Sequence, residues 1–430
     1  MAKKSKKLEE IHNMFEEYGI NASTIEHNEN VIFELKRKAA AIHDGRHESY
    51  VRHLLVDIVM ITVFAVLGNA NEWNEIESFA KKKEKWLRKY LELPNGIPTD
   101  DTIRIVIGSI DTSHFYNIVV QFLIEIMNGM LKIAGKSEDE FEKEIIAIDG
   151  KTTIGSKREA TDVEAVKALH TLNAFSTGYG MCIGQVFVNE KSNEIPAAPE
   201  LIAHLDIKDC VVTWDALNTQ KTTVEAIIKG KGDYVAALKG NHPIFYQEVQ
   251  EYFEDDILKE LTMDEKRYKK TTELEHSALV IREYFMTEDI LWFADRKDWK
   301  GLKTIGMIRK TTKKKTGEII IECRYYISSL ETDIELFARA VREHWGVENC
   351  LHWQLDFTFK DDKNTSMAKT SAKNLQIVKK IVLSILNIVK SAYKKSLKRI
   401  RYELSLDYEK GIEQLFSMLS IDAIENALNK

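Results

Sequence analysis

The stretch Ile145-Ile146-Ala147-Ile148-Asp149-Gly150-Lys151 is an apolar run that ends abruptly in a carboxylate, a glycine and a lysine. Four apolar residues in succession are typical of a strand that is buried on both faces. An acid at the carboxyl end of such a strand lies where α/β sheets bring reactive groups together. The stretch therefore predicts a sheet domain with Asp149 at its edge, to which other parts of the chain could bring further acids.

Length and charge set the broad class of protein. The chain has 430 residues, of which 44% are hydrophobic and 30% are charged, so we expect a globular protein of two or three units. Its 61 lysines and arginines face 67 acids, a net charge of −6. The protein is therefore not coated in positive charge, and any surface for nucleic acid must be local.

Neither the cysteines nor the apolar segments indicate a secreted or membrane protein. The four cysteines are far apart and form no CxxC pair, which argues against a zinc ribbon or a disulfide framework. The basic residues 1–7 lead into a polar segment rather than the apolar core of a signal peptide. The most apolar window, residues 54–68, is interrupted by Asp57 and is too short to span a bilayer, so we expect a buried helix there. We therefore expect a cytoplasmic protein.

The first third of the chain has helical periodicity. In residues 31 to about 135 the apolar positions recur at helical spacing, and Pro98 precedes Thr99, a good N-cap for the next helix. Asp100 and Asp101 suit the first turn of that helix, so we interpret them as capping residues rather than catalytic ones. A polar stretch at 135–140 follows, and it predicts a domain boundary near residue 140.

Beyond residue 140 the pattern changes to alternating strands and helices. Runs at 168–176 and 181–188 are separated by Thr177-Gly178-Tyr179-Gly180, which is a hairpin signal. Cys210-Val211-Val212-Thr213-Trp214-Asp215 is a second apolar run that ends in an acid, and 234–239 is a further buried strand. This order predicts an α/β domain with a meander at its start.

Two further segments complete the chain. Residues 255–330 are rich in strand-forming residues, and we expect an insertion whose basic stretches, 266–270 and 309–315, are loops. Helical periodicity then returns at 334–355 and at 366–398.

A third acid stands out in the first of these helices. Six positions at spacings of 4, 3, 4, 3 and 4 share one helix face: Phe337, Val341, His344, Glu348, Leu351 and Leu355. This places Glu348 on the buried face. An ionised carboxylate there is costly unless it is paired, hydrogen-bonded or bound to a cation, so Glu348 calls for a partner.

Three carboxylates without a sulfur ligand favour a hard ion, Mg²⁺ or Mn²⁺. Two such ions can activate water and stabilise the leaving oxygen in phosphodiester cleavage, which is the reaction we favour. Any one of Asp149, Asp215 and Glu348 alone is equally compatible with a capped turn or a satisfied buried acid; the combination is more specific. His344, Glu348 and His352 on one helix would also suit a transition metal, but no second ligand pair is evident.

A resemblance rests on motifs that follow one another along the chain. They are Ile148-Asp149-Gly150-Lys151, Glu190-Lys191-Ser192-Asn193-Glu194-Ile195, Asp215-Ala216-Leu217, Asp233-Tyr234-Val235-Ala236-Ala237-Leu238-Lys239-Gly240-Asn241 and His344-Trp345-Gly346-Val347-Glu348-Asn349-Cys350-Leu351-His352-Trp353. In this order they resemble the H-repeat-associated group of insertion-sequence DDE transposases. Residues 44–102 are similar to the helical domain that accompanies them, so the likeness covers nearly the whole chain.

The resemblance implies a fold, an activity and a site. The fold class is an α/β ribonuclease-H-like catalytic domain with a β-rich insertion, preceded by an all-α N-terminal domain. Asp149, Asp215 and Glu348 match the family's three metal-binding acids, separated by 66 and 133 residues. Related transposases often carry Tyr, Arg and Lys around the last acid, where this chain has Val341, His344 and Leu355.

Other polar residues are candidates for DNA contact. They are Lys151, Lys239, Asn241, His344, Asn349 and His352. Solvated side chains are the plain alternative for the two lysines. A basic run at 373–401, interleaved with an apolar stripe, predicts an amphipathic helix whose polar face suits the DNA backbone.

We therefore predict a DNA transposase that cleaves phosphodiesters and transfers strands at insertion-sequence ends with Mg²⁺ or Mn²⁺, two ions per site. Its partners are double-stranded DNA, namely the terminal inverted repeats and the target, and further copies of itself; it is cytoplasmic and nucleoid-associated. The alternatives are a metal-dependent nuclease without strand transfer and an inactive DNA-binding descendant. The predicted units are a basic helical lead at 1–30, a helical domain for DNA binding or assembly at 31–140, the catalytic domain at 141–396 with its insertion at 255–330, and a helical tail at 397–430.

Overall fold

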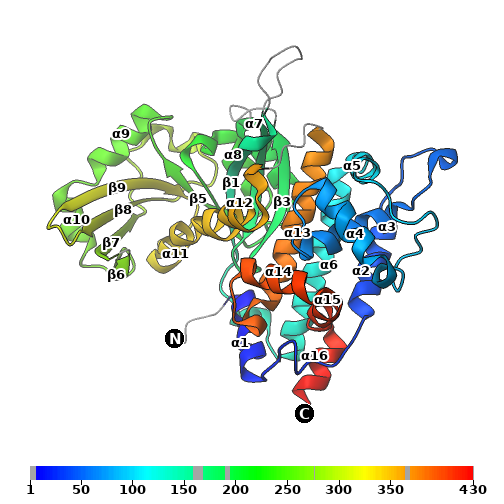
Figure 1. Ribbon diagram of the computed structural model, residues 1–430. Coiled ribbons are helices and arrows are strands. Elements are labelled where there is room, and N and C mark those ends of the chain that lie inside the picture. The colour runs from blue at the N-terminus through cyan, green and yellow to red at the C-terminus, as the bar shows by residue number, and fades with distance from the viewer. Residues whose placement is uncertain (1–5, 158–167, 189–193, 276, 364–368, 430) are drawn as a thin grey trace.

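A nine-stranded mixed sheet runs through the protein, with helices on its faces and a large helical body at one end (Figure 1). The computed structural model describes residues 6–157, 168–188, 194–275, 277–363 and 369–429. The strand order is β3-β2-β1-β4-β5-β9-β8-β7-β6. The first five strands along the chain therefore lie together, and the last four extend the sheet from β5.

The first five strands include the predicted meander. Their bounds are β1 Ile145–Thr153, β2 Leu169–Ser176, β3 Met181–Val188, β4 Val211–Trp214 and β5 Asp233–Leu238. Strands β1, β2 and β3 are antiparallel neighbours, which confirms the hairpin predicted around residues 177–180, and β4 and β5 run parallel to β1.

Strand β1 is longer than predicted. Its parallel pairing with β4 covers Ile145 to Ile148 and then ends, but its antiparallel pairing with β2 continues to Thr153. Asp149 therefore lies at the end of one ladder and in the middle of the other. The expectation that the strand stops at Asp149 was wrong because a residue can be at the edge toward one neighbour while the other neighbour continues.

Alternate residues of β1 are buried on opposite faces, as its apolar run requires. Ile146 and Ile148 pack in the same core as residues of α7 (Glu194–Ala203) and α8 (Lys221–Lys229). Ala147 belongs to the core of the helical body, and Ile145 packs with residues of α11 (Ile334–His344). Both faces of the sheet are thus covered at residues 145–148 of β1.

The four strands of the predicted insertion form an antiparallel continuation of the sheet. After α9 (Pro243–Tyr252) and α10 (Asp255–Leu261) come β6 Tyr268–Glu275, β7 Ala278–Thr287, β8 Thr304–Lys313 and β9 Ile319–Ser328. The basic stretches at 266–270 and 309–315 lie largely on β6 and β8 rather than in loops. That expectation failed because alternate side chains of a strand can be solvated, so basic residues are compatible with a ladder.

Helices from both ends of the chain build one body. The N-terminal ones are α1 Lys7–Glu17, α2 Asn30–Ala40, α3 Leu55–Leu67, α4 Trp73–Leu87, α5 Asp100–Gly108 and α6 Thr112–Ile133, and the C-terminal ones are α13 Lys369–Tyr393, α14 Leu397–Leu406, α15 Tyr408–Ser417 and α16 Ile421–Leu428. Helix α13 contacts α1, α3, α5 and α6, and a single apolar core joins them (Figure 1).

Two local predictions in this body are confirmed. Thr99 caps α5, because its hydroxyl accepts a hydrogen bond from the Thr102 amide at 3.3 Å. Helix α3 is buried along nearly its whole length. Among the described residues, no helix combines the length and the apolar character needed to cross a bilayer.

The basic run at 373–401 is not the continuous solvated face that its composition suggested. Lys379, Lys380 and Arg401 are each no more than 1% exposed. Arg401 donates hydrogen bonds to the carbonyl oxygens of Val66 and Thr358 at 2.7 and 2.5 Å. These cations hold parts of the fold together, because distant segments supply acceptors that the local pattern does not reveal.

Candidate active site

Strand register brings the first two acids side by side. Ile148 is paired with Trp214 across the parallel ladder of β1 and β4, so Asp149 and Asp215 are the next residues on the two neighbouring strands. The Asp149 side chain is 22% exposed and the Asp215 side chain 60% exposed. The sheet therefore presents one half-buried carboxylate and one open carboxylate at the same edge.

The third acid comes from a helical segment that crosses this edge. Helix α11 is followed by η7 (Val347–His352), a π-helical segment, and then by α12 (Trp353–Phe359). A π-helix has more residues per turn than an α-helix, so it rotates the positions that follow. Val347 and Leu351 take the buried positions, and Glu348 is exposed. The predicted buried face thus failed at Glu348, which instead opens toward the acids of the sheet.

All three acids line one cavity. Its volume is about 470 Å³, and Asp149, Asp215 and Glu348 are on its wall. Burial, together with the negative charges of Asp215, Glu348 and Glu194, raises the pKa of Asp149 to about 7, against a backbone hydrogen bond from Gly150 that lowers it. The cavity thus has a strongly negative potential at its base, where a cation would be stabilised.

The carboxylates share the cavity without forming a closed cage. Within the described part of the chain, no group of three His, Cys, Asp or Glu side chains stands close enough together to hold a metal ion. Asp215 and Glu348 are exposed, so solvent and ions can reach their carboxylates. Three carboxylate groups without a sulfur ligand suit Mg²⁺ or Mn²⁺.

His352 lies beside Asp149. Its Nδ1 is 3.4 Å from Asp149 Oδ2, and its Nε2 is 3.2 Å from Asn173 Nδ2. Burial and the nearby charges of Lys151 and Lys380 lower the pKa of His352 to about 3, so the imidazole is neutral. The contact with Asp149 is therefore that of a neutral ring with a carboxyl group, rather than an ion pair.

Two of the predicted DNA-contacting residues reach the same cavity. Lys239 follows β5, lines the cavity and has its Nζ 3.7 Å from Asp215 Oδ1, while its side chain is 59% exposed. His344, at the end of α11, also lines the cavity, and burial lowers its pKa. Its Nδ1 is buried and has no hydrogen-bond partner among the described residues. Both residues therefore belong to the wall of the cavity that holds the acids.

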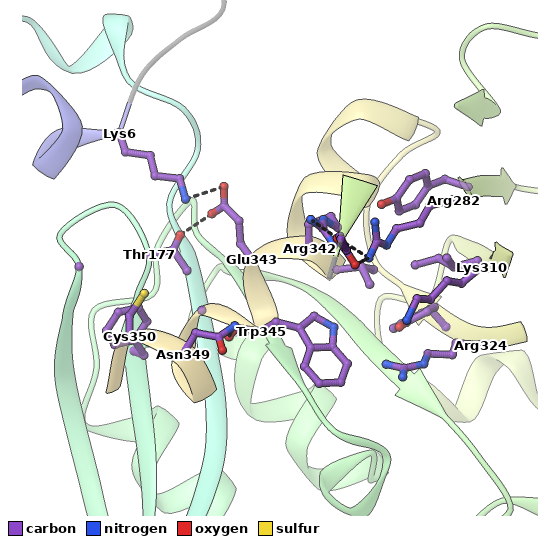
Figure 2. Close-up of a pocket in the computed structure, with 18 of the residues that line it drawn as sticks. Lys6, Thr177, Arg282, Lys310, Arg324, Arg342, Glu343, Trp345, Asn349 and Cys350 are labelled. Carbon is purple, nitrogen blue, oxygen red and sulfur yellow. Dashed lines mark hydrogen bonds and ion pairs between the residues drawn. The ribbon is translucent and has the colours of Figure 1, made fainter. Parts of the chain in front are cut away.

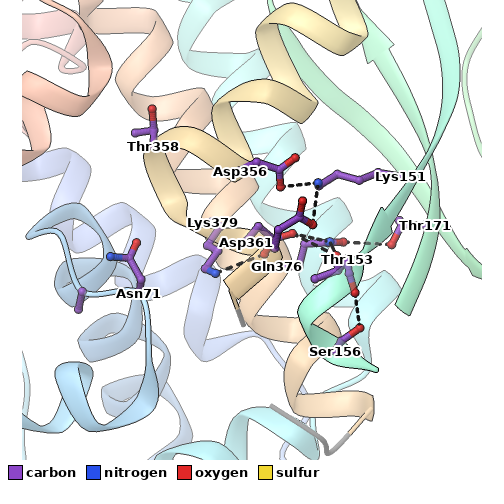
Figure 3. A network of polar contacts seen from close by, with 12 residues as sticks. Asn71, Lys151, Thr153, Ser156, Thr171, Asp356, Thr358, Asp361, Gln376 and Lys379 are labelled. Carbon is purple, nitrogen blue, oxygen red and sulfur yellow. Dashed lines mark hydrogen bonds and ion pairs between the residues drawn. The ribbon is translucent and has the colours of Figure 1, made fainter. Parts of the chain in front are cut away.

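Lys151 is not available to a ligand. Its side chain is 4% exposed, its ammonium donates to Asp356 Oδ1 at 2.5 Å, and it lies 3.6 Å from Asp362 Oδ1. The buried pair of Asp361 and Lys379 lies close by (Figure 3). The place of Lys151 two residues after Asp149 puts it on β1 beyond the site, paired with helix α12. The expectation of a phosphate contact from Lys151 was therefore wrong, since a strand residue at this position is covered by the helices.

The two asparagines lie outside the acid cavity. Asn241 donates from its Nδ2 to the carbonyl oxygen of Ala216 at 2.6 Å, so it braces the turn that follows Asp215. Asn349 lines a second, larger cavity of about 660 Å³, where it lies next to Trp345 and Cys350 (Figure 2). The structure thus separates these two residues from Lys239 and His344.

Arg324 is a residue that the sequence did not single out. It lies on β9, which pairs with β5 so that Tyr325 is opposite Leu238, and Arg324 therefore adjoins Lys239. It lines both cavities, is exposed and stacks over Trp345 at 4.8 Å from the ring centroid (Figure 2). No local signal marks it, because β5 and β9 are far apart in the chain.

Glu194 is a second residue without a predicted role. It is 3% exposed, contacts His170 Nε2 at 2.7 Å and accepts a hydrogen bond from Asn218 Nδ2 at 3.0 Å. It therefore joins α7 to β2 and to the turn after Asp215. Glu194 belongs to the motif at residues 190–195, but its contacts with His170 and Asn218 are seen only in the structure.

Comparison with known proteins places the chain in a family. Residues 140–382, more than half of the chain, match the family described as Transposase DDE domain, and residues 38–123 match the one described as DDE_Tnp_1-associated. The chain belongs to the Transposase DDE domain family. The match to the DDE family includes Asp149, Asp215 and Glu348.

Relatives of this transposase family cover nearly the same length. "Putative transposase YncI" of Escherichia coli O157:H7 is 35% identical over 375 residues, 86% of this chain and 90% of the relative. "H repeat-associated putative transposase YhhI" of E. coli K12 is 34% identical over 381 residues, 87% and 95% of the two chains. The resemblance inferred from the motifs is confirmed.

A solved structure also matches, at a low level. The piggyBac transposase in a synaptic complex with hairpin DNA aligns with 94% of this chain and 80% of its own, at a TM-score of 0.34 and 12% identity.

Proposed function

We propose that this member of the transposase family is an active DNA transposase that cleaves phosphodiester bonds at insertion-sequence ends and transfers the strands to a target. One observation carries the proposal: Asp149, Asp215 and Glu348 come from two strands and a helix, yet line the same cavity, and the charges of the last two raise the pKa of the first. Clustered carboxylates with a perturbed pKa are a mark of catalytic sites.

We infer that the catalytic part has a ribonuclease-H-like fold. The strand order β3-β2-β1-β4-β5, with an antiparallel meander followed by two parallel strands, supports this assignment. The insertion would then be the four strands β6 to β9, which follow β5 in the sheet and precede the helix of Glu348. The helices at 31–140 are proposed to bind DNA or to mediate assembly.

The three acids are proposed to hold Mg²⁺ or Mn²⁺, and two ions would fit the reaction class. Bound divalent ions would activate the attacking oxygen and stabilise the leaving oxygen of the phosphodiester. Burial and the neighbouring negative charges disfavour the ionised form of Asp149 in the metal-free protein. A divalent cation bound there would offset this cost, so the site favours cation binding.

Cations on the cavity wall are proposed to grip the DNA phosphates. Lys239 and Arg324 are exposed on adjoining strands, and both line the cavity of the acids. Arg324 would supply the guanidinium that the family's usual position, His344 here, does not carry. His344 has an unpaired buried nitrogen among the described residues and could accept or donate one further hydrogen bond.

The partners follow from this function. We propose double-stranded DNA, both terminal repeats and target, as the substrate, a homo-oligomer that pairs two ends, and a nucleoid-associated location in the cytoplasm. Asn241 would act on the turn after Asp215, through the Ala216 carbonyl, rather than on DNA directly.

The test uses a supercoiled plasmid that carries the DNA flanking the coding region, incubated with the full chain and Mg²⁺ or Mn²⁺. Loss of an outer partner of a metal ligand alone costs about 10- to 100-fold. We therefore expect Asp149→Asn, Asp215→Asn and Glu348→Gln each to lower cleavage by at least about 100-fold. Asp256→Asn, at an acid 95% exposed and outside the cavity, is the matched control and should cleave normally.

The products separate the candidate functions. Cleavage followed by joined products supports a transposase, and cleavage without joining identifies a nuclease. Binding without cleavage by the parent chain identifies an inactive descendant, for which Val341, His344 and Leu355 in place of Tyr, Arg and Lys are the favouring observation. Cleavage that survives all three acid substitutions would refute the proposed site.

A further inference from the structure

A buried lysine next to strand β2 does not line the cavity of the acids. Lys380, on α13, is 1% exposed, and its ammonium donates two short hydrogen bonds to amide oxygens: Asn173 Oδ1 at 2.6 Å and Gln185 Oε1 at 2.5 Å. Asn173 is 0% exposed and lies on β2 directly opposite Asp149 in the ladder. Asn173 therefore lies between Lys380 and Asp149.

The Asn173 amide can adopt only one orientation. A lysine amine is a donor toward both amides, so the atom facing it must be the Asn173 oxygen. On the other side, Asn173 Nδ2 donates to the carbonyl oxygen of Thr171 at 3.2 Å, which can only accept. Two independent partners thus place the oxygen toward Lys380 and the nitrogen away from it.

This orientation determines the state of His352. Asn173 Nδ2 has a second hydrogen, and it faces His352 Nε2 at 3.2 Å. Because a donor faces Nε2, that nitrogen must accept and cannot carry a hydrogen. In a neutral ring the hydrogen then lies on Nδ1, which faces Asp149 Oδ2 at 3.4 Å.

We propose that Lys380, Asn173 and His352 form a positioning relay that holds His352 in the Nδ1–H tautomer and so offers a donor to one oxygen of Asp149. Asp149 also lines the cavity of the acids. The relay acts through His352, so Lys380 and Asn173 are positioning residues. The tautomer follows from the contacts alone, while its use for metal binding rests on the proposed function.

A plain buried polar network is the competing explanation. In that case the same side chains would satisfy one another, but changing Asn173 would affect stability without altering the ring of His352 or the affinity for an ion. Outer partners of metal ligands, by contrast, orient the ligand, and their loss typically costs about 10- to 100-fold in metal affinity.

The first measurement is made on the metal-free full chain without DNA. In ¹⁵N-histidine NMR spectra, with His352 assigned from the signal lost in His352→Asn, we expect a protonated Nδ1 and a bare Nε2. Asn173→Asp keeps an acceptor for Lys380 but removes the donor to Nε2, so Nε2 should become protonated. Gln185→Glu changes the other acceptor of Lys380 and is the matched control: the tautomer should stay.

The second measurement is Mn²⁺ binding followed by electron paramagnetic resonance. We expect Asn173→Asp to weaken binding by about tenfold, and His352→Asn, whose amide nitrogen can take the place of Nδ1, to retain most of the parent affinity. Circular dichroism and thermal unfolding would show that each variant is folded.

The outcomes are distinct. An Nε2–H tautomer in the parent chain overturns the relay, even if Asn173→Asp fails to fold, and so does a tautomer that Asn173→Asp leaves unchanged. A changed tautomer with unchanged Mn²⁺ affinity overturns the positioning role. If tautomer and affinity behave as expected but the parent chain cleaves no DNA, the proposed function fails and the relay stands.

Discussion

At the scale of single residues, the site depends on one half-buried carboxyl group surrounded by like charges. Asp149 is less exposed than Asp215 or Glu348 and receives the field of both. Such a group titrates far above an ordinary aspartate, and so it responds to pH in the neutral range. The pKa of Asp149 can therefore be measured without any substrate, and it reports the electrostatic field in the cavity.

We predict that the Asp149 carboxyl titrates with a pKa of about 7 in the metal-free protein. The carboxyl is protonated below this pKa, and a cation must displace that proton, so Mg²⁺ affinity should fall about tenfold for each pH unit below 7. A ¹³C-carboxyl NMR titration measures the pKa. Glu348→Gln removes a charge that raises it and should lower the midpoint; a parent midpoint near 4 would contradict the burial of Asp149.

Arg324 is predicted to hold DNA. Replacement by alanine removes a charge-assisted contact to phosphate, so we expect DNA affinity to fall about tenfold at low salt, with a smaller effect at high salt. Arg324→Lys should recover part of the loss. The readout is fluorescence anisotropy with labelled duplex, with Lys259→Ala, 75% exposed and outside the cavity, as control. Equal affinities for Arg324→Ala and the parent would remove this residue from the interface.

Among the secondary-structure elements, the helical segment that carries Glu348 is irregular, and this irregularity places Glu348 at the cavity. The π-helical η7 lies between α11 and α12, so the buried positions continue at Val347 and Leu351 while Glu348 faces the cavity. On a regular α-helix, Glu348 would share the buried face of Val341. A π-helical turn is equivalent to one extra residue in an α-helix, and such turns are frequent at functional sites.

Deletion of Cys350 should convert this turn to a regular one. The helix would then rotate by about 100° on one side of the deletion, so Glu348 and His352 could not both face Asp149. We expect Mn²⁺ binding and DNA cleavage to be lost while helical content by circular dichroism stays near that of the parent.

The matched control is Cys350→Ala, which removes only an exposed thiol. It should bind Mn²⁺ and cleave like the parent. Retained cleavage in the deletion variant would show that the π-helical turn has no part in placing the acids.

Across the protein as a whole, the helical body and the sheet share a core and cannot be treated as loosely linked units. Helix α13 contacts both α5 and β3, and buried polar groups cross between the two parts. Arg401 is the largest of them: it is 0% exposed and lies over the ring of Phe359 on α12, while its donors reach carbonyls at the end of α3.

Arg401→Met is predicted to lower the free energy of unfolding by about 3 kcal/mol, because several buried carbonyl oxygens lose their donor. Arg401→Lys keeps one donor group and should lose less. Lys398→Met, at an exposed position of the same helix, should change stability by no more than about 0.5 kcal/mol. Urea unfolding followed by tryptophan fluorescence and by circular dichroism measures these values.

The two probes should also give one coincident transition. Because one core joins the helices of both ends of the chain, we expect them to unfold together with the sheet. Two separated transitions would show that the helical body is an independent unit.

The strands β1 to β5, the hairpin and the capped helix α5 could be predicted from the sequence, because apolar runs, turn residues and capping residues are local signals. Strand β6 and the end of β8 were missed, because their basic residues suggested loops. The sequence also contained the motifs that place the chain in its family. The exposure of basic residues on the C-terminal helices was predicted wrongly. Lys379, Lys380 and Arg401 were expected to be solvated but are buried.

The residues that surround the acids could not be predicted from local patterns. Lys151 is buried rather than exposed, and Glu348 is exposed at the cavity rather than buried. Arg324 lies beside Lys239, although the two residues belong to distant parts of the chain. Each of these outcomes depends on partners that lie far away in the chain. Whether a charged side chain binds a ligand or holds the fold together is therefore settled by which distant acceptors or donors the packing places next to it.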